Sequence, residues 1–223
     1  MKRALLVIAL ILVADQCLKV WVKLNFRLDE YVPQLADNWY YLHFIENPGM
    51  AFGLEFGGRT GKLVLTMFRI GAVVGIGWYL LHLVRRQARN WSIISMALIF
   101  AGALGNIIDS TFYGLLFSES TQFERAVFLP EGGGYGSMFH GAVVDMFYFP
   151  LFDGRFPDWL PIWGGQHFLF FRPVFNIADA SITTGVIMLL LQKREKKEWH
   201  VEVMASTEAG IQISSQPIDP ATS

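Results

Sequence analysis

The sequence is poor in charged residues and nearly free of cysteine. Only 17% of its 223 residues are charged, and the formal net charge is -1. Because there is no basic excess to neutralise phosphates, we expect no nucleic-acid partner. The single cysteine, Cys17, excludes an internal disulfide framework and gives no metal-ligand pattern, so we expect no metal and no other cofactor. The chain also lacks a visible internal repeat, which argues against a transporter built from duplicated halves.

Apolar residues dominate what is present. The chain is 53% hydrophobic and 15% aromatic, and its mean hydropathy of +0.37 is too high for an ordinary soluble domain of this length. Four segments reach the roughly 20 residues needed to cross a hydrocarbon core. They run approximately over residues 4–22, 62–84, 92–109 and 174–192. The sequence therefore predicts an all-α membrane protein, a four-helix transmembrane bundle.

Positive charge indicates how these spans are oriented. Basic residues cluster at alternate ends of the predicted spans, at residues 2–3, 85–89 and 193–197. Since such clusters favour the cytoplasmic side, both termini and the 85–91 connection are predicted to be cytoplasmic. The two longer connections, 23–61 and 110–173, then face outward.

The N-terminal run could also be interpreted as a cleaved signal peptide, because a basic start precedes a short apolar core. However, Asp15 and Gln16 stand where small residues would precede a cleavage point, and the helical pattern continues through "LKVWV". We therefore expect an uncleaved first span.

The connections and the tail differ in composition. The stretch "NWYYLHFIENPG" (38–49) combines aromatic and β-branched residues before a turn, which predicts a small outward-facing β-platform within 23–61. The second outer segment, 110–173, is expected to be a long loop or helix. Residues 198–223 lack a periodic apolar face, which predicts a disordered cytoplasmic tail. The sequence thus predicts one integral-membrane domain over residues 1–197.

Carboxylates stand in three of the predicted spans. At about 1.5 Å per helical residue, Asp15 lies roughly 18 Å and Asp179 roughly 21 Å from the inner side, while Asp109 reaches the outer boundary. An ionisable residue inside a span is costly and by default marks a functional site. The three carboxylates together predict a site in the outer part of the membrane.

Each of these carboxylates has a polar neighbour at helical spacing. The pairs are Asp15 with Lys19, Asn106 with Asp109, and Asn176 with Asp179. A separation of three or four residues places both members of a pair on one helix face. Such pairs can also serve only to hold helices together, but their shared depth favours a site.

A fourth carboxylate, Asp145, stands in the apolar outer stretch "HGAVVDMFYFP" (140–150). Burial raises the pKa of a carboxyl group, and two close carboxyl groups resist simultaneous ionisation. If Asp145 meets Asp179, the pair would share a proton. One member could then deprotonate a water molecule while the other protonates the scissile carbonyl, as in aspartic proteases.

Other functions are compatible with some of the same residues. Ser137 and His140 could form a serine-histidine pair, although their Gly-rich setting offers no rigid oxyanion site. An ion- or proton-coupled membrane carrier would use the intramembrane carboxylates as a relay, and a non-catalytic assembly protein would use them only in helix packing. The residues favour the hydrolase with two aspartates.

Five motifs of the chain resemble those of the bacterial lipoprotein signal peptidases, the signal peptidase II family. In chain order they are "DQCLK" (15–19), "NPGMAFG" (47–53), "GALGNIID" (102–109), "VVDM" (143–146) and "FNIADA" (175–180). The resemblance implies an aspartic endopeptidase of the bacterial cytoplasmic (inner) membrane, with its active site toward the periplasm. Its substrates would be diacylglyceryl-modified prolipoproteins, cut just before the lipidated cysteine. Membrane lipids and the cyclic peptide inhibitor globomycin are further implied partners.

The resemblance also implies roles for individual residues. Asp145 and Asp179 correspond to the catalytic dyad. Supporting positions, which would hold the dyad, the substrate backbone and the lipid-bearing residue, are Asp15, Lys19, Asn47, Gly49, Asn106, Asp109, Asn176 and Ala178.

The chain departs from the family pattern at two places. Ser110 stands where the family usually has an arginine, and Arg125 or Arg172 is a candidate to supply that charge. The segment between Asp109 and Asp145 is also longer than we expect for the family, which fits either an enlarged lid or a surface for a further partner.

Overall fold

The computed structural model divides the chain into two units. It describes residues 1–33, 40–48, 58–149, 152–162, 164–170, 174–192, 199–204 and 212–217. The first unit is Met1–Leu190 and the second is Leu191–Ser223. Every predicted site residue belongs to the first unit.

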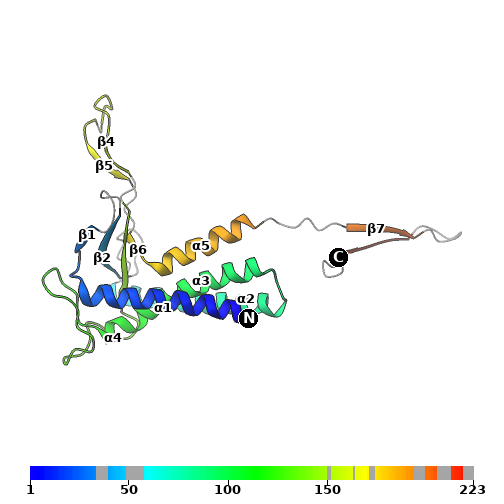
Figure 1. The fold of residues 1–223 in the computed structure, drawn as a ribbon, viewed down its shortest axis with the longest axis horizontal. Helices are drawn as coiled ribbons and strands as arrows, with labels where there is room; N and C mark the ends of the chain where they lie inside the picture. The colour runs from blue at the N-terminus through cyan, green and yellow to red at the C-terminus, as the bar shows by residue number, and fades with distance from the viewer. Residues whose placement is uncertain are drawn as a thin grey trace. The chain divides into compact units, whose positions relative to one another are not determined.

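Four apolar helices make up most of the described first unit (Figure 1). They are α1 (Lys2–Asn25), α2 (Gly58–Arg85), α3 (Asn90–Ile108) and α5 (Ile177–Leu191). The first three are long and apolar enough to cross a membrane, whereas α5 has only 15 residues. The mostly helical fold confirms the predicted class. The last helix, however, begins at Ile177 and not at residue 174.

The two ends of the helices differ. The N terminus and the connection between α2 and α3 lie at one end, and the β-sheet lies at the other (Figure 1). Basic residues of the connection, Arg85, Arg86 and Arg89, therefore stand at the end opposite the sheet. That this end is cytoplasmic remains a prediction.

The third helix does not stop at residue 109 as predicted. A π-helix, η1 (Asp109–Tyr113), and a short helix, α4 (Gly114–Leu116), continue it. Asp109 and Ser110 are buried within the π-helical turn. Turns of this kind are rare and often occur at functional sites.

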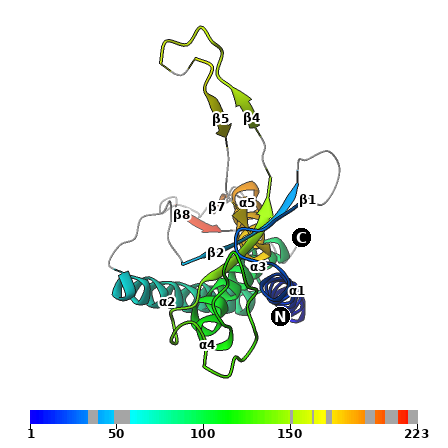
Figure 2. The same ribbon diagram turned by 90° about the vertical axis from the view of Figure 1, so that its left-hand side faces the viewer.

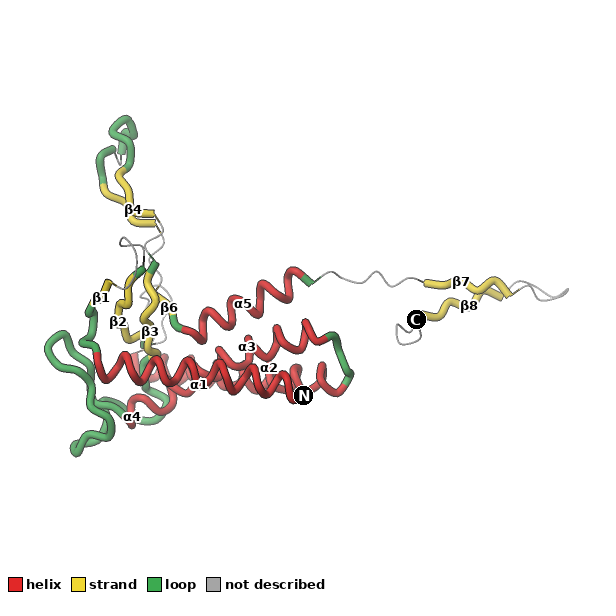
Figure 3. Tube along the Cα trace, in the orientation of Figure 1, coloured by secondary structure: helices red, strands yellow, loops and turns green. Residues whose placement is uncertain are grey.

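A four-stranded antiparallel sheet has the strand order β1-β2-β3-β6 (Figure 3, yellow). Its strands are β1 (Tyr31–Pro33), β2 (Tyr41–Asn47), β3 (Val143–Tyr148) and β6 (Val174–Phe175). The predicted platform thus takes two of its strands from outside residues 23–61. Pairing places Ile45 opposite Asp145 and Asn47 opposite Val143.

An apolar core joins the sheet to the helices. Leu42 and Phe44 of β2 and Val144 and Met146 of β3 are buried in it, two residues apart on each strand. Because side chains alternate along a strand, Asp145 points to the opposite face from Val144 and Met146. The helical and loop members of this core are Val22, Phe26, Tyr113, Phe117 and Ala126.

Glycine allows α3 and α5 to approach closely. A Cβ atom at Gly102 would lie 2.2 Å from the carbonyl oxygen of Ala178, and one at Gly185 would lie 2.6 Å from that of Ser95. Small residues at such contacts are typical of helices that pack in membranes. The contact at Gly102 brings the start of α5 against the C-terminal half of α3.

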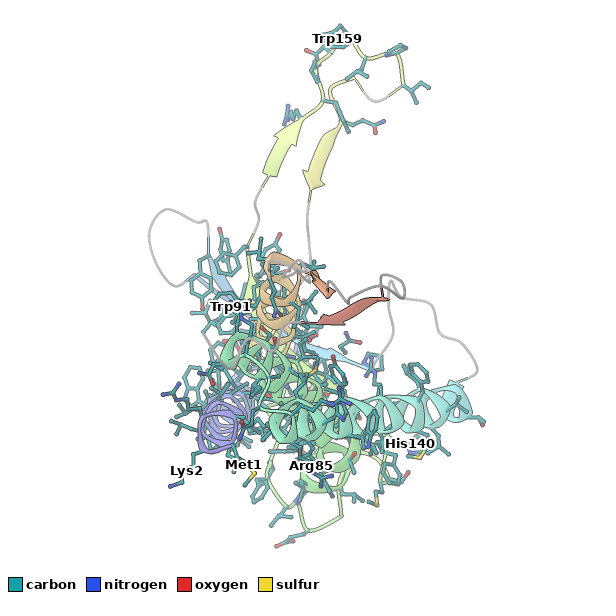
Figure 4. All side chains as sticks on the ribbon, turned by 90° about the vertical axis from the view of Figure 1, so that its right-hand side faces the viewer. Met1, Lys2, Arg85, Trp91, His140 and Trp159 are labelled. Atoms are coloured by element: carbon teal, nitrogen blue, oxygen red, sulfur yellow. The ribbon has the colours of Figure 1, made fainter. Side chains whose placement is uncertain are left out.

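Two hairpins complete the described structure. In the first unit β4 (Phe152–Arg155) pairs with β5 (His167–Phe170) (Figure 2), and exposed Trp159 lies in the connection between them (Figure 4). In the second unit β7 (Trp199–Met204) pairs with β8 (Gln212–Pro217), where the sequence predicts no regular structure.

Candidate active site

The start of α5 holds Asn176 and Asp179 in a reciprocal cap. The N–H of Asp179 donates to Asn176 Oδ1 at 2.9 Å, and the N–H of Asn176 donates to Asp179 Oδ2 at 3.4 Å. In such a capping box, the residue before a helix and the third helical residue satisfy each other's backbone N–H groups. The cap accounts for the start of α5 at Ile177 and orients the Asp179 carboxylate.

Asn176 also contacts Asp145. Its Nδ2 donates to Asp145 Oδ1 at 2.7 Å and to the carbonyl oxygen of Val144 at 3.2 Å. Asn176 is fully buried and Asp145 is 5% exposed, whereas Asp179 is only partly buried. One asparagine therefore touches both carboxylates, and Asp179 is the more accessible of the two.

The surroundings of Asp145 favour its protonated form. Burial, and next the negative charge of Asp179, raises the pKa of Asp145 to about 7. The charge of Lys19 and hydrogen bonds from Asn176 and Asn47 act in the opposite direction. A carboxyl group with this pKa beside a second carboxyl group is suited to hold a shared proton.

Asn106 connects the two carboxylates to a buried lysine. Its Nδ2 donates to Asp179 Oδ1 at 2.8 Å. Its Oδ1 accepts hydrogen bonds from Lys19 Nζ at 2.8 Å and from Asn176 Nδ2 at 3.1 Å. Because the Asn106 amide oxygen takes both donors, its nitrogen must face Asp179.

Lys19 is surrounded by acceptors. Its Nζ lies 2.8 Å from Asp15 Oδ2 and 2.8 Å from Asp109 Oδ2, in addition to its bond with Asn106. All three donors of the ammonium group are thus used. Lys19 is fully buried, so its loss would leave two buried carboxylates without a counter-charge.

Asp15 and Asp109 tie other elements to this lysine. Asp15 Oδ1 accepts the N–H of Ala178 at 2.9 Å, which satisfies one of the free N–H groups at the start of α5. Asp109 Oδ2 accepts the N–H of Val144 at 3.4 Å. Four elements, α1, β3, α5 and the continuation of α3, therefore meet at Lys19.

The predicted site residues that the structure describes form one connected network. They are Asp15, Lys19, Asn47, Asn106, Asp109, Asp145, Asn176, Ala178 and Asp179. Gly49 lies outside the described residues.

The alternative pair of Ser137 and His140 also forms a contact, with Ser137 Oγ 3.0 Å from His140 Nδ1. The same Nδ1 lies 2.9 Å from the carbonyl oxygen of Met138, which can only accept a hydrogen bond. If Nδ1 carries a hydrogen and donates it to that oxygen, it cannot accept the serine proton.

Arg69 is a residue of the site that the sequence analysis missed. It lies on α2, on the same helix face as the buried residues Thr66 and Val73, and its charge interacts with Asp179 and Asp145. An arginine inside the predicted span 62–84 is itself a signal of function, and it could have identified this position.

The structure also locates the residues considered in place of the family arginine. Ser110 is buried, and its Oγ donates to the carbonyl oxygen of Asn106 at 3.0 Å, so it supplies no charge. Arg125 is exposed, and Arg172 lies outside the described residues. Arg69 therefore brings a positive charge to the two carboxylates from a different helix.

A second buried cluster beside Asn47 was not predicted either. Lys23 forms an ion pair with Glu46 and donates to Ser120 Oγ at 2.9 Å, and Ser120 Oγ donates to Glu46 Oε1 at 2.6 Å. Lys23 is one further helical turn along from Asp15 and Lys19, a spacing that could have revealed it. The cluster fixes the end of β2 from which Asn47 reaches Asp145.

Comparison with known proteins shows the family. A family model described as signal peptidase (SPase) II matches residues 7–193. A lipoprotein signal peptidase of Porphyromonas gingivalis is 50% identical over 185 residues, which cover 82% of this chain and 79% of the relative. Another, of Amoebophilus asiaticus, is 36% identical over 219 residues, 96% of this chain and 88% of the relative. The chain belongs to the signal peptidase II family.

Solved structures support the fold. One bacterial membrane enzyme matches with a TM-score of 0.55 at 20% identity, covering 86% of this chain and 92% of that chain. A second bacterial membrane enzyme matches with a TM-score of 0.52 at 21% identity, covering 89% of this chain and 95% of that chain. Together with the apolar helices, these matches identify a multi-pass membrane protein.

Proposed function

We propose that this protein is an aspartic endopeptidase that removes the signal peptide of diacylglyceryl-modified prolipoproteins, cutting just before the lipidated cysteine. Two curated relatives are named lipoprotein signal peptidases. The observation that carries the proposal is the contact of one buried residue, Asn176, with both Asp145 and Asp179. Asn176 thereby holds together two carboxylates from different elements, of which Asp145 is buried and Asp179 is partly exposed.

In the proposed mechanism, Asp145 and Asp179 share one proton. The ionised member takes a proton from a water molecule, whose oxygen attacks the scissile carbonyl carbon, while the protonated member donates to the carbonyl oxygen. The intermediate then collapses as the C–N bond breaks: the dyad donates a proton to the leaving amine and receives one from a hydroxyl group on the tetrahedral carbon, which restores the shared proton. Neither a metal nor a covalent enzyme intermediate is needed.

The supporting residues would keep this geometry. Asn106 and Asn176 orient the two carboxylates, and the buried charges of Asp15, Lys19 and Asp109 hold the surrounding elements. Asn47, Gly49 and Ala178 complete the supporting positions, which together would hold the dyad, the substrate backbone and the lipid-bearing residue. Ala178 is buried and its N–H is taken by Asp15, so it would act by positioning Asp179. The inhibitor globomycin would occupy the same place.

The proposed orientation puts the dyad on the periplasmic side of the cytoplasmic membrane. The sheet that carries Asp145 lies at the end of the helices opposite the basic connection between α2 and α3 (Figure 1). Basic connections favour the cytoplasm. A lipidated cysteine keeps its acyl chains in the outer leaflet, so its scissile bond would lie at that level.

The test compares wild type with Asp145→Asn and Asp179→Asn in a reconstituted cleavage assay on a diacylglyceryl-modified prolipoprotein. Each substitution is nearly isosteric and should leave a folded protein that cleaves roughly 10²- to 10⁴-fold more slowly. Asp158→Asn, at an exposed carboxylate between β4 and β5, is the matched control and should cleave normally. Normal processing by both dyad variants would refute the proposal. A carrier would instead show altered ion flux with processing unchanged.

A further inference from the structure

The segment after α4 is a hairpin held to the end of a spanning helix. Phe117 forms a bridge with Phe128, and the N–H of Ser118 donates to the carbonyl oxygen of Val127 at 3.0 Å. The N–H of Leu129 donates to the carbonyl oxygen of Leu116 at 2.7 Å. Residues 127–129 are therefore fixed against the last residues of the candidate span Asn90–Leu116.

Buried side chains anchor the same hairpin to the rest of the first unit. Phe117 and Ala126 belong to the apolar core. Ser120 joins the buried Lys23–Glu46 pair, and the carbonyl oxygen of Thr121 accepts the N–H of Leu28. The hairpin thus presents its outer side chains in a fixed arrangement.

Three consecutive large apolar residues of the hairpin, Val127, Phe128 and Leu129, stay exposed over about half of their surface, and we call them the apolar clip; the ring of Phe128 also contacts that of buried Phe117. They are 57%, 49% and 62% exposed. No charged residue stands between Arg125 and Glu131. Exposing such a run to water is unfavourable by about 25 cal/mol per Å² of apolar surface, so a contiguous patch indicates a partner.

The length of the helix indicates where the clip lies. The candidate span Asn90–Leu116 has 27 residues, which at about 1.5 Å each extend roughly 40 Å. A bilayer with its headgroup regions is about 40–45 Å thick. Leu116 and the clip beside it therefore lie in the headgroup region opposite the basic connection between α2 and α3.

We propose that the apolar clip inserts into the lipid surface beside the end of α3. Phe112 and Leu115, on the helical turns that precede the hairpin, are also large apolar residues, 43% and 44% exposed. Phenylalanine and leucine suit the boundary between headgroups and acyl chains. The long segment before Asp145 was considered either an enlarged lid or a surface for a further partner, and the proposal makes it a surface whose partner is lipid. The proposal does not depend on the catalytic one.

The test places an environment-sensitive fluorophore on the clip of the full chain in lipid nanodiscs. Cys17, the single cysteine, is replaced by serine, and Phe128→Cys is labelled. Glu124→Cys and Glu131→Cys, at exposed charged positions on either side of the clip, are the matched controls. Each probe is exposed to nitroxide-labelled lipids and, separately, to aqueous iodide.

Insertion predicts that lipid nitroxides quench the Phe128→Cys probe several-fold more than either control, and that iodide quenches it several-fold less. Equal iodide quenching at all three positions would overturn the inference, because the clip would then face water. Protection from iodide without quenching by lipid nitroxides would overturn it as well, since a protein surface would then cover the clip.

Discussion

At the level of single residues, the contacts of Asn176 explain how two carboxylates come together at the end of a membrane helix. Its backbone and side chain cap α5 through Asp179, and its amide nitrogen reaches Asp145 on β3. Loss of the side chain would both uncap the helix and leave the Asp145 carboxylate without this donor. The asparagine is thus a structural and an electrostatic partner of the proposed dyad.

The raised pKa of Asp145 leads to a prediction about the pH dependence of cleavage. In the proposed mechanism the dyad is active with one shared proton, and burial and the charge of Asp179 raise the pKa of Asp145 to about 7. As the pH rises through this value the pair loses its proton, so the cleavage rate should fall from slightly acidic to alkaline pH. A rate that stays constant from pH 6 to about 8.5, with folded protein throughout, would contradict the shared proton.

Arg69 provides a second residue-level prediction. Its positive charge interacts with Asp179 and Asp145, and removal of a nearby positive charge disfavours an ionised carboxylate, so Arg69→Gln should shift the pH profile of cleavage upward. Arg69→Lys keeps the charge and should restore most of the wild-type profile. Arg85→Gln, at the opposite end of α2, is the control. A lower rate without a shifted profile would show that Arg69 acts only in packing.

At the level of elements, the junction of α3 with α5 positions the site. Ala178 lies against Gly102 of α3 and donates its N–H to Asp15 of α1. The start of α5, including the next residue, Asp179, is therefore fixed by two helices at once. A small displacement there would move one carboxylate relative to the other.

Gly102→Ala tests this dependence. The added Cβ would meet the Ala178 carbonyl oxygen at 2.2 Å and Ile182 at 2.8 Å, so we expect a loss of roughly 1–3 kcal/mol in stability and slower cleavage. Gly71→Ala is the matched control, because its Cβ would meet nothing within 4 Å. That change should be neutral or slightly stabilising, since alanine favours a helix over glycine. Equal behaviour of the two variants in thermal unfolding and cleavage would contradict this role of the junction.

At the level of the whole molecule, the described site residues lie in the first unit, and the region that matches the family model ends just beyond its boundary. The matched family region covers residues 7–193, and the network extends from Asp15 to Asp179. The second unit, Leu191–Ser223, contributes none of the described site residues. We therefore expect the first unit to be sufficient for proteolysis.

Removing residues 198–223 tests that assignment at the predicted domain boundary. The shortened chain should fold, enter the membrane and cleave the prolipoprotein at the wild-type rate, because all proposed catalytic and supporting residues remain. A marked drop in the cleavage rate of correctly inserted, folded protein would show that the tail takes part in catalysis or substrate binding.

The sequence by itself determined the apolar class, the helices and the candidate carboxylates, because hydrophobic run length and helical spacing are local properties of the chain. Asp15, Lys19, Asn106, Asp109 and Asp179 could be grouped by counting residues along predicted spans. Asp145 could be proposed as a partner only conditionally, since its distance from α5 depends on strand pairing. The apolar run also placed the start of the last helix three residues too early.

Only the tertiary structure decided how these residues are arranged. The capping box of Asn176, the π-helical turn after α3 and the pairing of β2 with β3 depend on contacts between distant segments. The same is true of Arg69, whose importance depends on which helix face meets the carboxylates. Long-range packing and the need to satisfy buried polar groups set these positions, and neither is encoded in the spacing of residues along one helix.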